Sequence, residues 1–188
     1  VVVCAGFGGP ANRYGVNPWS GTQTFGSTRN GAYFAHCDSV IAYAKTKGIY
    51  MHLYPDYLGG DPSQGWSQET NNSTLTQMYQ WGQFVGGRWK DSTNVLWSIG
   101  GDTDPTNIVP NGWNVQAKCD TMAKGIRQAG ANQLMTTRDE TNTTSDNHWP
   151  AGTYTWWNLN QYYTYNTSQY TYTRACRGRR PAKPFFLS

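Results

Sequence analysis

Charged residues are scarce in this sequence, since Asp, Glu, Lys and Arg together make up only 14% of its 188 residues. Hydrophobic residues are also few, at 37%, whereas aromatic residues reach 15%. No apolar run approaches the roughly 20 residues that a membrane-spanning helix needs, so we expect no membrane partner. Because disordered chains are poor in aromatic residues, the composition predicts one folded domain.

Sequence motifs for several kinds of chemistry are missing. No Cys-x-x-Cys pair occurs among the 4 cysteines, and no Gly-x-Ser-x-Gly motif is present. The 3 histidines include no pair with metal-ligand spacing: they are His36, His52 and His148. We therefore expect no metal, no cofactor and no serine-hydrolase chemistry.

The net charge of +4 comes from one short stretch near the end of the sequence. That stretch carries five basic residues: Arg174, Arg177, Arg179, Arg180 and Lys183. Without them, 10 basic residues face 11 acidic ones. Nucleic-acid-binding proteins usually spread basic residues over a face or groove, so we expect a solvated loop here and no nucleic acid as a partner. A phosphate-binding patch is the alternative.

The composition is typical of a protein that is secreted to the extracellular space or the periplasm. Charges are few, Asn, Thr, Tyr and Trp are many, and Asn-x-Ser/Thr sequons occur, among them those at Asn72, Asn142 and Asn166. Cys37 and Cys119 fall on apolar helix stripes and are expected to be buried thiols. Cys4 and Cys176 could form a disulfide, a pairing that sequence leaves open.

Strands and helices are predicted to alternate along the chain. Apolar spacing predicts helices over 32–47, 74–89 and 114–129, with Asn30 and Ser73 as candidate caps for the first two. Short apolar runs predict strands over 1–4, 49–54, 94–99, 133–137, 155–159 and 184–187. This alternation indicates an α/β fold with a parallel sheet.

The loops after the strands are long and the loops before them are short. The long ones are 5–30, 55–72, 100–112 and 138–153. In a (β/α)8 barrel, loops after strands build the active site, so we predict a TIM-like barrel. A barrel needs about 250 residues, so residues 1–188 are expected to be a single but incomplete barrel domain, without its first and last units. A doubly wound sheet is the alternative fold.

Asp102 is the strongest candidate for a catalytic residue, within Trp97-Ser-Ile-Gly-Gly-Asp-Thr-Asp-Pro105. The strand delivers it to the mouth of the barrel, and the two glycines let the backbone approach a ligand closely. A carboxyl group half-buried among indole rings would keep its proton at neutral pH, as a general acid must. Asp102 or Asp104 could instead cap the next turn, and Asp104 fits that alternative.

Polar and aromatic residues follow the other predicted strands as well. Amides and carboxylates bind sugar hydroxyls, and flat rings stack on sugar faces, so we expect carbohydrate as the ligand. The predicted substrate-binding residues are Asn17, Trp19, Tyr54, Asp56, Arg138, Asp139, Glu140, His148, Asn160 and Tyr163. Trp19, Trp66 and Trp149 are the best candidates for exposed stacking positions, and packing in the core is the alternative for each.

Five stretches stand out by their order and spacing: Tyr33-Phe-Ala-His-Cys-Asp-Ser-Val-Ile41, Gly48-Ile-Tyr-Met-His-Leu-Tyr-Pro55, Tyr79-Gln-Trp-Gly-Gln-Phe-Val-Gly-Gly-Arg-Trp-Lys90, Asn94-Val-Leu-Trp-Ser-Ile-Gly-Gly-Asp-Thr-Asp-Pro105 and Trp156-Trp-Asn-Leu-Asn160. Together they resemble the apiosidase-like glycoside hydrolases, relatives of enzymes that trim apiose from plant pectin. The sequence departs from this family at Thr137-Arg138-Asp139, where relatives tend to carry a His-Pro pair, a difference that bears on the sugar bound.

The resemblance implies a (β/α) barrel and a two-carboxylate mechanism with Asp102 as the acid/base. Its partner would be a nucleophilic Glu just after Ser188, following the strand that begins at Lys183. A retaining glycosidase holds its two carboxyl groups about 5–5.5 Å apart. Within this sequence, Glu140 is the one acid considered as a substitute.

These observations predict a hydrolase that cleaves O-glycosidic bonds in plant or microbial polysaccharide by a retaining mechanism. Its partners would be an oligo- or polysaccharide and the rest of the same polypeptide. The alternative is a non-catalytic extracellular protein that binds carbohydrate, or serves a structural role, on a hydrolase-like fold. An acidic residue after Ser188 would favour the enzyme.

Overall fold

The computed structural model describes residues 2–4, 11–20, 24–163 and 183–187. Its largest sheet has four parallel strands in the order β1 (Val2–Cys4), β4 (Met51–Tyr54), β5 (Val95–Gly100) and β6 (Met135–Arg138). Trp97 pairs with Leu53 on one side and with Met135 on the other. All three side chains are buried, so they belong to the core of the protein.

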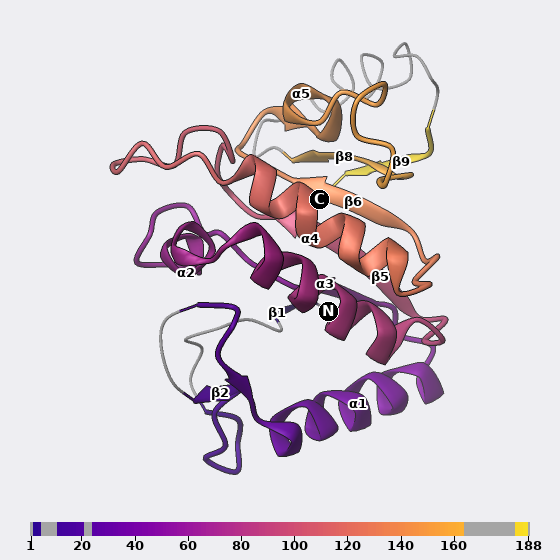
Figure 1. The fold of residues 1–188 in the computed structure, drawn as a ribbon. Coiled ribbons are helices and arrows are strands. Elements are labelled where there is room, and N and C mark those ends of the chain that lie inside the picture. The colour runs from indigo at the N-terminus through magenta and orange to yellow at the C-terminus, as the bar shows by residue number, and fades with distance from the viewer. Residues whose placement is uncertain (1, 5–10, 21–23, 164–182, 188) are drawn as a thin grey trace.

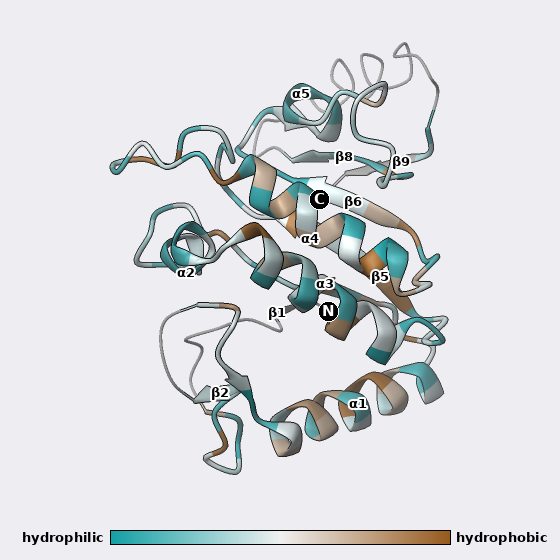
Figure 2. Cartoon of the chain, in the orientation of Figure 1, coloured by the Kyte–Doolittle hydropathy of each residue, from teal (hydrophilic) through white to brown (hydrophobic). Residues whose placement is uncertain are grey.

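Three helices cover one face of this sheet: α1 (Gly31–Thr46), α3 (Leu75–Trp89) and α4 (Gln116–Gln128) (Figure 1). Hydrophobic and hydrophilic segments alternate along each helix (Figure 2), as expected when only one side of a helix packs on a sheet. A doubly wound sheet carries helices on both faces. The one-sided arrangement therefore favours the barrel-like fold over that alternative.

A second sheet continues beside β6. It contains β7 (Thr143–Thr144), β8 (Asn160–Tyr163) and β9 (Phe185–Leu187), with β9 parallel and β7 antiparallel to β8. The backbone N–H groups of Asn158 and Leu159 donate to the Met135 carbonyl at 3.0 and 3.1 Å, so the chain enters β8 alongside β6. The α/β fold is confirmed, but the strands described here form separate sheets and do not close into a barrel.

Several predicted loops contain short regular elements. The loop 5–30 includes the hairpin of β2 (Trp19–Ser20) and β3 (Thr28–Arg29), and the loop 55–72 ends in α2 (Ser67–Asn72). His148 was expected in a loop, but it ends the short helix α5 (Ser145–His148), which begins with a capping box. None of the described helices is long and apolar enough to cross a membrane.

The structure confirms one of the two helix caps that the sequence predicted. The Asn30 side chain accepts a backbone N–H from the first turn of α1 at 3.1 Å, as expected. Ser73 does not cap α3, because Thr74 takes that position and forms a capping box with Gln77. The Ser73 hydroxyl instead accepts the backbone N–H of Phe25 at 2.9 Å. Ser73 therefore joins the end of α2, just before α3, to the hairpin segment.

The strand predicted over 155–159 is wrong, since β8 begins one residue after it. Trp156 and Trp157 are buried in the core. Their indole N–H groups donate to Asp120 Oδ1 and to the Trp149 carbonyl, each at 2.9 Å. These aromatic residues therefore pack in the core although their backbone is irregular. Aromatic residues are also common in β-strands, so their presence alone did not distinguish the two structures.

Helices α3 and α4 pack closely because glycines occupy their contact. A Cβ atom on Gly82 would lie 2.1 Å from the carbonyl oxygen of Met122, and one on Gly125 would lie 2.4 Å from that of Tyr79. Backbone atoms cannot move away as a flexible side chain can. The spacing of the two helices therefore depends on these glycines.

We expect Gly82→Ala to lower the free energy of unfolding by about 2–3 kcal/mol, because the added methyl group forces the two helices apart. Gly87 lies on the same helix and provides a matched control, since a Cβ there would meet only the Ala129 Cβ, at 3.9 Å. Gly87→Ala should be neutral or stabilising by up to about 1 kcal/mol through helix propensity. Urea unfolding of both variants measures this difference, and equal effects would contradict the close contact.

Candidate active site

Asp102 follows β5 through a turn in which three consecutive residues are left-handed. The φ angles are +84° at Gly100, +140° at Gly101 and +58° at Asp102. Position 101 requires glycine, because a Cβ there would lie 2.4 Å from Cδ2 of Tyr57. Asp is one of the few other residues that adopt left-handed backbone readily. The turn directs the Asp102 carboxylate towards the Tyr57 ring.

Two donors hold the Asp102 carboxylate. The Tyr57 hydroxyl donates to Oδ2, and Nη2 of Arg138 lies 2.8 Å from Oδ1. The side chains of Asp102 and Arg138 are 22% and 18% exposed, so the ion pair is partly shielded and still open to solvent. A carboxylate fixed in this way can contact a bound molecule in a defined direction.

Arg138 is fixed in turn by two tyrosines. Its guanidinium lies 4.1 Å from the centre of the Tyr163 ring and is hydrogen-bonded to Tyr54. Burial disfavours the charge on Arg138, but Tyr54 and Asp102 outweigh burial and raise the pKa of Arg138.

Burial, and secondly the charge of Arg138, lowers the pKa of His52 to about 4, so His52 is neutral at neutral pH.

The indole rings expected around Asp102 are replaced by a phenol ring and a guanidinium. Trp66 is half-buried and packs edge-on against Tyr57, with ring centres 6.3 Å apart. Trp19 and Trp149, predicted as exposed stacking positions, are only 8% and 0% exposed. Both pack against other aromatic rings, so the core-packing alternative is right for these two positions.

Asp56 and Asp139, predicted to bind substrate, are 0% and 3% exposed. Asp56 Oδ2 accepts a hydrogen bond from the Cys119 thiol of α4 at 3.4 Å, and Asp139 Oδ1 accepts the Trp149 indole N–H at 3.1 Å. Burial raises the pKa of Asp56 to about 7 and that of Asp139 well above 3.8. Both carboxyl groups are enclosed by protein, which contradicts the prediction that Asp56 and Asp139 bind substrate.

The sequence as a whole matches one known family, whose profile is described as "Apiosidase-like, catalytic domain" and covers residues 3–188. The chain belongs to this apiosidase-like family. None of the curated proteins is a significant match to it.

The apiosidase-like domain shares its fold with solved glycoside hydrolase structures. A glycoside hydrolase family 5 protein from Bacteroides vulgatus has a TM-score of 0.75 and 23% identity, over 98% of this chain and 41% of that one. A second structure, described as a glycoside hydrolase, has a TM-score of 0.74 and 21% identity, over 98% and 43%. Identities this low show the fold alone, and the chain spans less than half the length of either protein.

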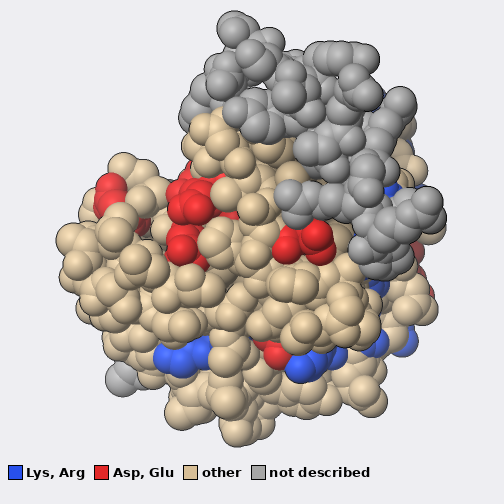
Figure 3. All heavy atoms as spheres, turned by 90° about the horizontal axis from the view of Figure 1, so that it is seen from above, with Lys and Arg blue, Asp and Glu red and all other residues tan. Residues whose placement is uncertain are grey.

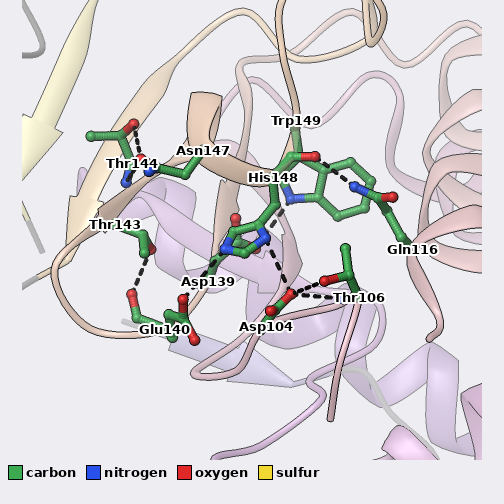
Figure 4. Close-up of polar contacts among 10 residues, drawn as sticks. All are labelled: Asp104, Thr106, Gln116, Asp139, Glu140, Thr143, Thr144, Asn147, His148 and Trp149. Atoms are coloured by element: carbon green, nitrogen blue, oxygen red, sulfur yellow. Dashed lines mark hydrogen bonds and ion pairs between the residues drawn. The ribbon is translucent and has the colours of Figure 1, made fainter. Parts of the chain in front are cut away.

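A second polar cluster of the apiosidase-like domain joins three segments (Figure 4). His148 Nδ1 lies 3.1 Å from Asp104 Oδ1, and His148 Nε2 lies 3.5 Å from Glu140 Oε1. Asp104 Oδ1 also accepts the backbone N–H and the hydroxyl of Thr106, at 2.8 and 2.7 Å, so the turn-capping alternative is right for Asp104. Glu140 contacts His148, and within the described residues nothing joins it to Asp102.

The remaining predicted residues lie at different places in the apiosidase-like domain. Tyr54, Arg138 and Tyr163 gather beside Asp102, as described above. Asn160 begins β8 and is 5% exposed. Asn17 is exposed in the segment before β2, which Figure 1 places beside the start of α1.

Sequence reasoning missed Tyr57, which contacts Asp102 directly. The available signal was its position two residues beyond the Pro55 that ends the strand, together with the paired glycines before Asp102.

Cys119 is buried as expected, whereas Cys37 is half-buried and burial raises its pKa to about 11. Cys176, Asn166 and the arginines of the basic stretch lie outside the described residues.

Lys183, the last residue of the basic stretch, was expected in a solvated loop. Its ammonium donates to the Trp157 carbonyl at 2.6 Å and lies 3.3 Å from the centre of the Trp157 ring. Lys183 therefore attaches the start of β9 to the core of the apiosidase-like domain.

Proposed function

We propose that this chain forms part of a secreted or periplasmic glycoside hydrolase that cleaves glycosidic bonds in plant or microbial polysaccharide. The observation that carries the proposal is the position of Asp102. Its carboxylate lies beyond the carboxyl end of a parallel strand, partly open to solvent, and is oriented by Tyr57 and Arg138. Membership of the apiosidase-like family supports the same reaction class.

Asp102 is proposed to act as the general acid and base. In this role it gives a proton to the leaving glycosidic oxygen and later removes one from the attacking water. The Tyr57 hydroxyl and the Arg138 guanidinium keep the carboxylate in one direction, which a proton transfer to a bound sugar requires. Carbohydrate rings are proposed to stack near Trp66, the half-buried indole that packs against Tyr57.

The second carboxylate is proposed to follow β9. Strand β9 runs parallel to β8, and its last described residue, Leu187, lies opposite Tyr162, next to Tyr163 in the chain. Tyr163 packs on Arg138, which pairs with Asp102. We propose a Glu just after Ser188 as this second carboxylate, and a separation of about 5–5.5 Å from Asp102 would give retention of configuration.

The test uses the full-length protein and a panel of plant and microbial polysaccharides. Release of new reducing ends, together with an acidic residue directly after Ser188, would support a hydrolase. Retarded migration in a polysaccharide gel without any release of reducing ends would support the non-catalytic binding protein instead. The second result would overturn the proposal.

Tyr57→Phe should lower kcat about tenfold while leaving KM nearly unchanged, because it removes one donor that orients the Asp102 carboxylate. Tyr43→Phe is the matched control, since Tyr43 is 65% exposed on α1. Equal kinetics for the two variants would remove Tyr57 from the site.

A further inference from the structure

The His148 side chain lies between two carboxylates. Its Nδ1 is 3.1 Å from Asp104 Oδ1 and its Nε2 is 3.5 Å from Glu140 Oε1, so the two acids contact opposite sides of the ring (Figure 4). The His148 side chain is only 15% exposed, and both of its nitrogens have an acidic neighbour. This placement favours a role within the protein over the predicted contact with substrate.

The imidazole can serve both acids only when each of its nitrogens carries a proton. A neutral imidazole has one N–H, so it donates to Asp104 or to Glu140 and presents a lone pair to the other carboxylate. The imidazolium has two N–H groups and a positive charge, so it donates to both. The two-sided contact therefore fits the charged form of His148.

The charges around the ring also favour a cation at this position. Within the described part of the chain, no lysine or arginine forms an ion pair with Asp104 or Glu140. In the view from above, acidic groups lie near the middle of the visible face and basic groups lie towards its lower edge (Figure 3). Burial, and further the charges of Asp104 and Glu140, raise the pKa of the neighbouring Asp139, which therefore favours its neutral form.

Local contacts hold the less exposed half of this arrangement in place. Asp104 Oδ1 accepts the backbone N–H and the hydroxyl of Thr106, at 2.8 and 2.7 Å. The His148 carbonyl accepts the Gln116 side-chain N–H of α4 at 2.6 Å, and a capping box at Thr144 fixes the start of α5. The side chain of Glu140 is 46% exposed and is the looser partner.

The contacts of His148 join the two segments that carry the proposed acid and its arginine partner. Asp104 lies two residues after Asp102, and Glu140 lies two residues after Arg138. Nη2 of Arg138 lies 2.8 Å from Asp102 Oδ1, so a shift of either segment would change the direction of the Asp102 carboxylate.

We propose that His148 is a positioning residue whose imidazolium bridges Asp104 and Glu140 and so fixes Asp102 against Arg138. The effect on catalysis rests on the proposed hydrolase function, whereas the bridge itself does not. In this role His148 contacts neither the substrate nor the reacting atoms, and it acts through Asp102.

Two conservative variants each keep one half of the bridge. Asn places its amide nitrogen near the position of Nδ1, so His148→Asn keeps a donor for Asp104 and loses the contact with Glu140. Gln reaches the position of Nε2, so His148→Gln keeps a donor for Glu140 and loses the less exposed contact, with Asp104. In the full-length protein acting on an aryl glycoside, we expect kcat to fall about threefold for His148→Asn and about tenfold for His148→Gln, with KM nearly unchanged.

A residue that acts through Asp102 should have no further effect once Asp102 cannot transfer a proton. Adding His148→Gln to Asp102→Asn should therefore leave kcat within about twofold of that of Asp102→Asn alone. A higher KM for His148→Gln, or losses that multiply in the double variant, would show an independent contact with substrate and overturn the positioning role. His36→Gln is the matched control, since His36 lies on α1 and packs on Tyr14, and it should keep wild-type kinetics.

Urea unfolding tests the bridge without any activity. Asp104→Asn keeps an acceptor for Thr106 and removes the charge that faces Nδ1 of His148. His148→Gln and Asp104→Asn should each lower the urea midpoint, and the double variant should lose no more than the less stable single variant. Single variants as stable as the wild type, or fully additive losses, would overturn the bridge. A protein that hydrolyses no glycoside would contradict the proposed function, and the unfolding result would still decide whether the bridge exists.

Discussion

Asp102→Asn should lower the turnover of a natural polysaccharide by about 100- to 10,000-fold, which is the contribution of a positioned general acid and base. Asn keeps the shape of Asp102 and can still accept the Tyr57 hydroxyl, but it has no proton to give to a leaving sugar oxygen. An aryl glycoside with a good leaving group needs less protonation. The loss measured on such a substrate should therefore be smaller than the loss on the polysaccharide.

The comparison needs a control for folding, because Asp102→Asn also removes the ion pair with Arg138. Circular dichroism and thermal unfolding should show a folded variant with at most a modest loss of stability. Asp91→Asn, at an exposed position, should keep wild-type turnover. Turnover of Asp102→Asn close to that of the wild type would remove Asp102 from the mechanism and leave the proposed reaction without its acid.

Sequence periodicity predicted the three long helices to within two residues at either end, because each carries an apolar stripe that packs on the sheet. It failed at Trp156 and Trp157, where a run of aromatic residues satisfies strand and core patterns equally well. Aromatic content also misled at Trp19 and Trp149. Exposure depends on what packs against a ring, and this is a property of the folded chain.

The candidate site was predicted in part for a related reason. A position at the end of a parallel strand places a residue at the mouth of the fold, but it does not give the direction of the side chain. Asp102 stays partly open to solvent, because a left-handed turn directs it towards Tyr57 and Arg138, whereas Asp56 packs against Cys119 of α4. The meeting of Asp104 with His148 depends on two loops and a short helix that share no sequence pattern.

The buried position of Asp56 leads to a strong pH dependence of stability. Burial raises its pKa to about 7 from 3.8, so between these values the folded state binds a proton that the unfolded state does not. The free energy of unfolding therefore falls as pH rises through this window. The full effect is on the order of 4 kcal/mol, of which about 2–3 kcal/mol falls between about pH 5 and pH 8.

Asp56→Asn removes this titration and keeps an acceptor for the Cys119 thiol, so the variant should gain stability relative to the wild type as pH rises. His52 acts with the opposite sign, since its lowered pKa of about 4 weakens the folded state as pH falls. Both proteins carry His52, so its effect cancels in their difference. Urea unfolding at a series of pH values measures that difference, with Asp91→Asn as the exposed control. Parallel curves for Asp56→Asn and the wild type would show that Asp56 does not take up the proton on folding.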